Sequence, residues 1–174
     1  MKKVLSIVLF VICGGAFLLL AMGSVFDTDT SKYDTSKEYS VGDTLTCPSF
    51  DIKVEKIEFK QKGTMVDGNK LIEDPEWIGV TLTVTNTTKK KQKFYSSDTR
   101  LINTSGEELK HAQRTYKIWE SELLNNPDLK KEESKTGYIQ FINNSLDNSN
   151  LILKVNCSTG FLSSKIVYDV NVSE

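Results

Sequence analysis

The residue types that could carry out catalysis are sparse in this chain. Nucleophilic catalysis needs a nucleophile, a base and a group that orients the base. His111 is the only histidine in the 174 residues, and its place beside an expected hairpin is typical of a surface or edge-strand residue. The sequence contains no G-x-S-x-G motif and no phosphate-binding glycine loop. These observations predict that the protein is not an enzyme.

Neighbouring acidic residues could act as the two carboxylates of a glycoside hydrolase. In Glu73–Asp74 and Glu132–Glu133, however, the two residues are adjacent, and adjacent side chains of an extended chain point to opposite sides. We therefore interpret both pairs as solvated loop charges and keep a hydrolase only as a remote alternative.

Metal ligands are equally sparse. Two distant cysteines and one histidine cannot supply the four ligands of a zinc site. Asp27, Asp29 and Asp34 could attract calcium, but they lie in a segment that we expect to be flexible. We predict no metal and no cofactor.

Two cysteines, Cys47 and Cys157, follow the apolar N-terminal segment. An even number of cysteines in an oxidising compartment indicates a disulfide. In the chain-entropy model, closing a loop of about 110 residues contributes roughly 4–5 kcal/mol to stability, less any strain in the folded state. We predict that the two are bonded and join the first core strand to one near the chain end, with two free thiols as the alternative.

Two segments could contact a partner. Lys89, Lys90 and Lys91 belong to a basic run that could touch anionic wall polymers or lipid headgroups, or could form a solvated turn. Tyr116 and Trp119 fit strand alternation poorly. An exposed aromatic patch there would suit a protein interface, while packing into the core is the alternative.

The first residues predict delivery to a membrane. Lys2 and Lys3 precede residues 4–22, which carry no charge. A helix of this length covers roughly 28 Å, close to the ~30 Å hydrocarbon core of a bilayer. Because positive flanks stay in the cytoplasm, the rest of the chain is expected outside.

The fate of this segment, residues 1–23, is open between two alternatives. An uncleaved membrane anchor fits its length, whereas the small residues Ala21 and Gly23 would suit cleavage by a signal peptidase and secretion. Lipid attachment at Cys13 is disfavoured, because the residue before it is Ile12 rather than a small one.

The remainder divides into a stalk and one domain. Residues 24–39 are polar and are expected to form a flexible stalk. From residue 40 to 174 apolar residues recur with period two, most clearly in residues 77–86. The apolar phase shifts between Val54 and Ile57, which predicts a β-bulge. Seven or eight short strands without a long helix predict an all-β, immunoglobulin-like β-sandwich.

The overall charge argues against nucleic acid as a partner. The formal net charge is −1, with 22 basic and 23 acidic residues. Nucleic-acid binding depends on neutralising phosphates, for which such a domain has no surplus of positive charge.

Four segments resemble a bacterial extracellular domain of unknown function in the immunoprotective-extracellular, immunoglobulin-like group. They are residues 39–44 (YSVGDT), 77–87 (WIGVTLTVTNT), 101–107 (LINTSGE) and 135–141 (KTGYIQF). The resemblance covers about residues 40–172, although the Pro-Gly that usually precedes the strand at Tyr138 is missing. It implies a sandwich fold behind a lipoprotein signal or membrane anchor, and it implies no catalytic residues.

Taken together, the sequence predicts a non-enzymatic binding or accessory module on the outer side of a bacterial cell membrane. Its partners would be the membrane, through the N-terminal helix, and an unidentified protein or cell-envelope component. A secreted effector or antigen, released by signal cleavage, is the alternative.

Overall fold

The computed structural model describes residues 33–60, 65–66, 69–70, 76–112, 122–143, 149–157 and 166–173. The predicted membrane segment, residues 1–23, lies outside these ranges and stays a prediction. Among the described residues, no helix has the length and apolar character needed to cross a membrane.

The described chain is built almost entirely of strands, with one short 3-10 helix, η1 (Ser96–Asp98). The strands are β1 (Tyr39–Ser40), β2 (Thr44–Thr46), β3 (Phe50–Lys60), β4 (Met65–Val66), β5 (Asn69–Lys70), β6 (Glu76–Asn86), β7 (Gln92–Lys93), β8 (Thr99–Ile102), β9 (Lys110–His111), β10 (Asp128–Leu129), β11 (Ser134–Asn143), β12 (Ile152–Asn156) and β13 (Val167–Asn171).

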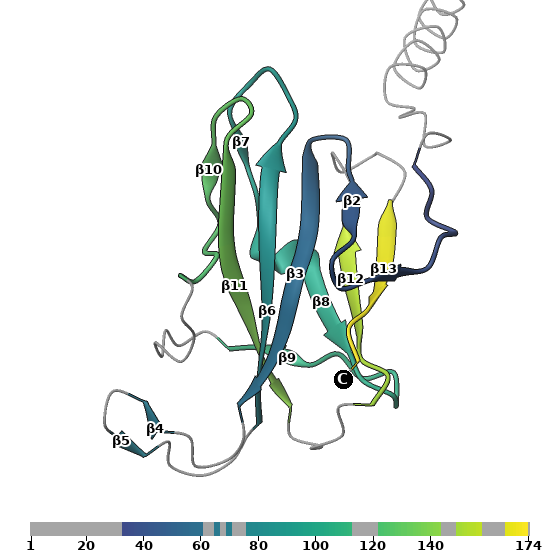
Figure 1. The fold of residues 1–174 in the computed structure, drawn as a ribbon, viewed down its shortest axis with the longest axis vertical. Helices are drawn as coiled ribbons and strands as arrows, with labels where there is room; N and C mark the ends of the chain where they lie inside the picture. Colours follow the sequence, from purple (N-terminus) through teal and green to yellow (C-terminus); the bar gives the residue numbers. More distant parts are fainter. Residues whose placement is uncertain are drawn as a thin grey trace, which may run out of the picture.

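Two sheets form a sandwich (Figure 1). One sheet has the order β2-β3-β6-β11-β9 and the other has the order β1-β13-β12-β8, while β10 pairs with β7 and β4 with β5 in two small ribbons. The predicted all-β sandwich is therefore confirmed. The additional strands of two residues were not predicted, because so short a stretch carries no alternation.

The core lies between the two sheets and follows from the alternation of the central strands. On β6, Ile78, Val80, Leu82 and Val84 are fully buried. β6 pairs antiparallel with both β3 and β11, which flank it along its whole length. From the other sheet, the side chains that close this core are those of Leu101, Leu153, Val155, Tyr168 and Val170.

The bulge predicted in the first long strand is present. The register between β3 and β6 shifts between Val54 and Lys56, so that Val54 pairs with Leu82 and Lys56 with Thr81. This extra residue lets Val54 and Ile57 both pack on the core side despite their odd spacing.

The predicted boundary between the stalk and the domain, after residue 39, falls within β1, which pairs with β13. Tyr39 pairs in parallel with Val170 of β13, is buried, and stacks edge-to-face on Tyr168 with ring centroids 5.2 Å apart. The hydroxyl of Tyr39 donates to the carbonyl of Asp34 at 2.9 Å. Tyr39, which we predicted to end the stalk, is thus anchored to the sandwich. The division of the chain into anchor, stalk and domain stays a prediction.

Candidate functional site

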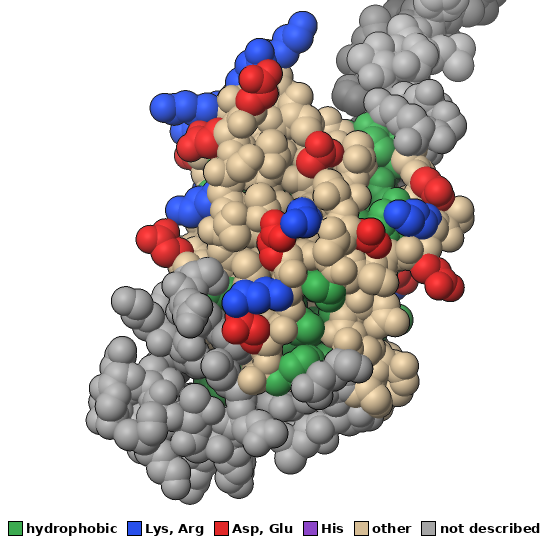
Figure 2. Space-filling model, in the orientation of Figure 1, with side chains coloured by type: hydrophobic (Ala, Val, Ile, Leu, Met, Phe, Trp, Pro, Cys, Tyr) green, Lys and Arg blue, Asp and Glu red, His purple; other side chains and the backbone are tan. Residues whose placement is uncertain are grey.

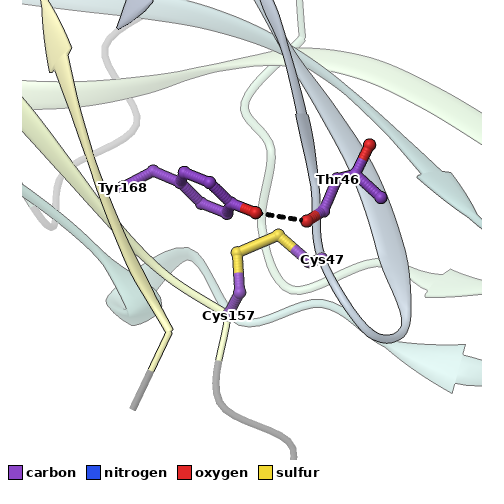
Figure 3. The surroundings of a disulfide bond; sticks show 4 residues. All are labelled: Thr46, Cys47, Cys157 and Tyr168. Carbon is purple, nitrogen blue, oxygen red and sulfur yellow. Dashed lines mark hydrogen bonds between the residues drawn. A yellow bond between two sulfur atoms is a disulfide. The ribbon is translucent and has the colours of Figure 1, made fainter. Parts of the chain in front are cut away.

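The predicted disulfide is formed. Cys47 follows β2 and Cys157 follows β12, and their Cα atoms are 5.3 Å apart across a sequence separation of 110 residues. Since β2 and β12 belong to different sheets, the bond joins the two layers of the sandwich (Figure 3). Beside it, the Tyr168 hydroxyl donates to the Thr46 carbonyl at 2.6 Å, a second link between the same layers.

The predicted basic contact residues lie at one end of the sandwich. Lys89, Lys90 and Lys91 follow β6, and Lys93 lies on β7. The pairing of β7 with β10 brings the next turn alongside, which carries Lys130 and Lys131. We call these six exposed residues the lysine end. Figure 2 shows lysine and arginine side chains gathered at the upper end of the molecule, where Figure 1 places these turns.

Asn86, at the end of β6, positions both turns of the lysine end. Its amide nitrogen donates to the carbonyls of Lys90 at 2.8 Å, Leu129 at 3.0 Å and Lys130 at 3.0 Å. Its amide oxygen accepts from the backbone N–H of Thr88 at 2.9 Å. The side chain is fully buried. One amide therefore makes hydrogen bonds with backbone groups of two segments that are more than forty residues apart in sequence.

The charge of this end is positive within an acidic chain. Residues 87–93 and 128–133 together hold the six lysines and three carboxylates, whereas the formal net charge of the whole chain is −1. Lys91 pairs with Asp128 at 2.9 Å and lowers the pKa of that carboxyl, and Lys131 pairs with Glu132 at 3.0 Å. These pairs are exposed and contribute little to stability; their effect is to leave a net positive surface.

A pocket of about 190 Å³ adjoins the lysine end. Its apolar wall includes Phe50 and Phe94, which stack edge-to-face with centroids 5.8 Å apart. At its rim Tyr95 is 48% exposed, and the ammonium of Lys93 lies 5.6 Å from the centroid of that ring. The pocket is further lined by Cys47, Ser49, Ile52, Gln92, Asp98, Asn156 and Cys157.

Among the described residues that line this pocket, Asp98 is the one acidic side chain. Burial raises the pKa of its carboxyl, an effect that the nearby Arg100 guanidinium partly opposes. Within the described part of the chain, the carboxylate of Asp98 forms no ion pair and accepts no hydrogen bond. The pocket therefore combines aromatic surface with one positive and one negative side chain that do not pair with each other.

A second pocket, of about 440 Å³, contains the histidine. His111 lies on β9, at the edge of the five-stranded sheet, as predicted. Its Nε2 atom is 2.8 Å from the Thr99 carbonyl and its ring lies 4.6 Å from that of Phe141. Ser96 lines the same pocket, but its hydroxyl donates to Asn126 at 3.1 Å. Both polar groups thus make structural hydrogen bonds, and the described residues that line this pocket include no carboxylate that could orient the imidazole.

Some of the other residues that we considered from the sequence lie within the described ranges, and the rest lie outside them. Glu132 and Glu133 lie in the turn before β11, where Glu133 accepts from the backbone of Lys130 at 2.7 Å. Asp34 accepts hydrogen bonds from Ser36 and Lys37 of its own loop, which lower its pKa. The predicted contact residues Tyr116 and Trp119, the acidic pair Glu73–Asp74, and Asp27 and Asp29 all lie outside the described ranges and stay predictions.

The outer face of the five-stranded sheet carries an apolar cluster that sequence reasoning missed. Trp77 and Tyr138 are buried there, with Ala112, Leu123 and Ile142 packed against them. Trp77 precedes Ile78 on β6 and so points to the face opposite to the main core. The outward position of Tyr138, opposite Thr81, could have been read from the alternation of β11.

Comparisons with known proteins identify the fold and nothing finer. No protein-family model and no curated protein sequence matches the chain. Among solved structures, the yjhA protein of Bacillus subtilis is similar at 17% identity and a TM-score of 0.61, covering 76% of this chain and 98% of its own. A functionally unknown protein of Listeria monocytogenes EGD-e is similar at 10% identity and a TM-score of 0.55, with 83% and 92% covered.

A third similar structure is ycdA, a candidate lipoprotein of Bacillus subtilis, at 14% identity and a TM-score of 0.51. The likeness covers 78% of this chain but only 39% of ycdA. At these identities the likenesses show the fold alone: the chain is a β-sandwich of a kind found in bacterial proteins. Its place in an immunoglobulin-like family stays a prediction.

Proposed function

We propose that this chain is a non-enzymatic binding or accessory module, held on the outer side of a bacterial cell membrane by its N-terminal segment. We further propose that its lysine end contacts anionic lipid headgroups. The observation that carries the proposal is the position of the lysine end. In Figure 1 the described chain begins in the upper half of the view, the half that also contains the β6–β7 and β10–β11 turns.

Two observations support the location outside the cytoplasm. Disulfides persist in oxidising compartments and are rare in the cytosol, and Cys47 is bonded to Cys157. The fold is shared with ycdA, a candidate lipoprotein. Both agree with the uncharged run in residues 4–22, which has the length of a membrane span.

The tether would keep the lysine end near the bilayer. Even a fully extended chain gains at most about 3.3–3.6 Å per residue, so residues 23–32 could reach no further than about 35 Å. Each lysine that comes within about a Debye length of an anionic surface, roughly 8–10 Å, contributes about 1 kcal/mol. Contacts too weak to recruit a free protein become effective when a tether raises the local concentration.

Fractionation of the producing cells tests the location. Washed membranes are expected to retain the full-length protein, and protease added to intact cells is expected to digest it. A shortened protein recovered from the medium would instead support the secreted effector or antigen.

Lysine reactivity in nanodiscs tests the orientation. The full-length protein is placed in discs of phosphatidylglycerol or of phosphatidylcholine and briefly treated with an amine-acetylating reagent, and acetylation is quantified by mass spectrometry. Lys89 and Lys90 are expected to react several-fold more slowly in the anionic discs, and salt should abolish the difference. Lys110, which pairs with Ile142 near the end of β11 away from the β10–β11 turn, is the internal control. Equal reactivity of Lys89 in both discs would overturn the proposed contact.

A further inference from the structure

We infer that the pocket between Lys93 and Asp98 binds a small zwitterion of the amino-acid type, whose ammonium contacts Asp98 and whose carboxylate contacts Lys93. This inference deepens the proposed binding function and rests on it. It names the chemistry of a ligand for a site that the fold alone does not assign.

The first argument is charge. A partly buried carboxylate is costly unless a positive group or hydrogen-bond donor compensates it. Asp98 forms no ion pair and accepts no hydrogen bond among the described residues, and the nearby Arg100 guanidinium, which pairs with Glu108, compensates its charge only in part. Lys93 lines the same pocket. Lys93 directs its ammonium over the Tyr95 ring instead. Two opposite charges held apart in one pocket are complementary to a ligand that carries both.

The same pair disfavours simpler ligands. A plain anion drawn to Lys93 would be repelled by Asp98, and a plain cation drawn to Asp98 would be repelled by Lys93. Only a molecule with both charges gains at both ends, and its own charges are then matched rather than left desolvated.

The second argument is size and lining. Pockets for drug-sized molecules span about 300–1,000 Å³, whereas this one holds about 190 Å³. That volume suits a molecule as small as a single amino acid. Its apolar side chain would meet Phe50, Phe94 and the half-exposed ring of Tyr95, and the side chains of Ser49 and Gln92 add a hydroxyl and an amide for orientation.

The third argument is rigidity, because a preformed site loses less entropy when it binds. The floor of the pocket includes the Cys47–Cys157 bond. Asp98 ends η1, where its backbone N–H donates to the Tyr95 carbonyl at 3.0 Å. The Thr99 hydroxyl donates to the Ser96 carbonyl at 2.6 Å, so the turn that carries Asp98 is closed by two hydrogen bonds.

The test titrates free amino acids into the full-length protein in uncharged detergent micelles, with backbone NMR shifts of Tyr95 and Asp98 as the readout. Alanine is compared with propionate, which lacks the ammonium, and with ethylamine, which lacks the carboxylate. A panel of glycine, alanine, valine and leucine, in both configurations where they exist, covers the side chain. At least one amino acid is expected to bind, and its two truncated analogues are expected to bind about tenfold more weakly or not at all.

Variants connect the binding to the two charges. Asp98→Asn and Lys93→Gln are each expected to weaken binding about tenfold or more. The matched controls Asp169→Asn and Lys89→Gln remove the same charges from exposed positions that do not line the pocket and should leave the affinity within about twofold. Thermal unfolding of each variant verifies that it is folded.

Three outcomes would overturn the inference: no shift with any amino acid at about 10 mM, far above a weak Kd of 1 mM; equal binding of propionate or ethylamine; or unchanged affinity in both pocket variants. None of these outcomes affects membrane retention of the protein. The experiments can therefore contradict the proposed ligand without contradicting the proposed attachment to the membrane, and the reverse.

Discussion

The hydroxyl of Tyr168 on β13 donates a hydrogen bond of 2.6 Å to the backbone carbonyl of Thr46 on β2, across 122 residues of sequence. β2 and β13 belong to different sheets, so this bond ties the layers together beside the disulfide, as Figure 3 shows. Burial is the main cause that raises the pKa of Tyr168 to about 12, and the neighbouring Tyr39 adds to it.

Replacing Tyr168 with Phe should change both the stability and its dependence on pH. At neutral pH the variant should lose about 1 kcal/mol, because the Thr46 carbonyl loses its donor. The pKa of Tyr168 in the folded state is about 12, above the value of about 10 for an unfolded tyrosine. The favourable contribution is therefore complete below pH 10 and is lost as the pH rises towards 12.

Urea unfolding between pH 9 and 12 measures this difference. The wild-type protein should lose stability more steeply than Tyr168→Phe above pH 10. Tyr95→Phe, an exposed replacement of the same type, should follow the wild-type curve. Parallel curves for the wild-type protein and Tyr168→Phe would show that ionisation of Tyr168 does not cause the loss of stability above pH 10.

The disulfide should contribute a large share of the stability. A loop closed across 110 residues corresponds to about 4–5 kcal/mol in the chain-entropy model, less any strain. The double variant Cys47→Ala/Cys157→Ala should lose stability of that order in denaturant unfolding. Reduction of the wild-type protein should produce a similar loss, and the same reductant should leave the double variant unchanged. A loss well below 1 kcal/mol would contradict the entropic account for this fold.

The parts of the fold that were predicted from sequence are those governed by burial with period two. The four buried residues of β6, from Ile78 to Val84, alternate with residues of the outer face. The shift in the apolar pattern after Val54 marks the bulge. One extra residue reverses the alternation, so that Ile57, three residues after Val54, again faces the core. The disulfide followed from the count of cysteines outside the membrane segment, without any knowledge of their distance.

What escaped prediction depends on contacts between distant segments. Asn86 resembles an ordinary turn residue in the sequence, and two of its three carbonyl partners, Leu129 and Lys130, become visible only when their distant segment is placed beside it. The pocket of Lys93, Tyr95 and Asp98 also draws lining from residues 47–52 and 156–157. Local sequence patterns do not carry such information, because the pocket forms only when these three separate segments are brought together.

Gly137 should be intolerant of even the smallest side chain. A Cβ atom built there would lie 2.6 Å from the carbonyl oxygen of Glu122 and 3.1 Å from Cβ of Leu124. The same short segment is fastened to β11 on both sides of Tyr138, whose N–H donates to Glu122 and whose carbonyl accepts from Leu124. Since the obstruction includes backbone, it cannot rotate away.

Gly137→Ala should therefore lose about 1–3 kcal/mol, the usual cost of overpacking. Thr136→Ala, an exposed change on the same strand, should lose less. Hydrogen exchange should show faster exchange at the Leu124 and Tyr138 amides in Gly137→Ala than in Thr136→Ala. Wild-type stability and protection in Gly137→Ala would mean that the 122–124 segment is not held against β11 in solution.

Asn86 offers the sharpest test of the lysine end, because its oxygen and nitrogen have different partners. The amide nitrogen faces three carbonyl oxygens, those of Lys90, Leu129 and Lys130, at 2.8–3.0 Å. Asn86→Asp keeps the shape but places a carboxylate oxygen against these carbonyls. The other carboxylate oxygen would keep its donors from Thr88, but a buried charged oxygen that faces carbonyl oxygens costs several kcal/mol or forces protonation. We expect the variant to be less stable than the wild-type protein by about 3 kcal/mol or more at pH 7, in the range of a broken buried network.

The sign of the pH dependence follows from the same geometry. The new carboxyl should have a raised pKa in the folded state, because only its protonated form can donate to a carbonyl. The stability lost at pH 7 should therefore be partly recovered as the pH falls to about 4–5, because the folded protein then binds a proton that the unfolded chain, with a pKa of about 4, still largely lacks. Asn86→Ala, which cannot titrate, is the control and should show a loss that does not depend on pH. Equal pH profiles for the two variants would contradict the assignment of the Asn86 nitrogen to the three carbonyls.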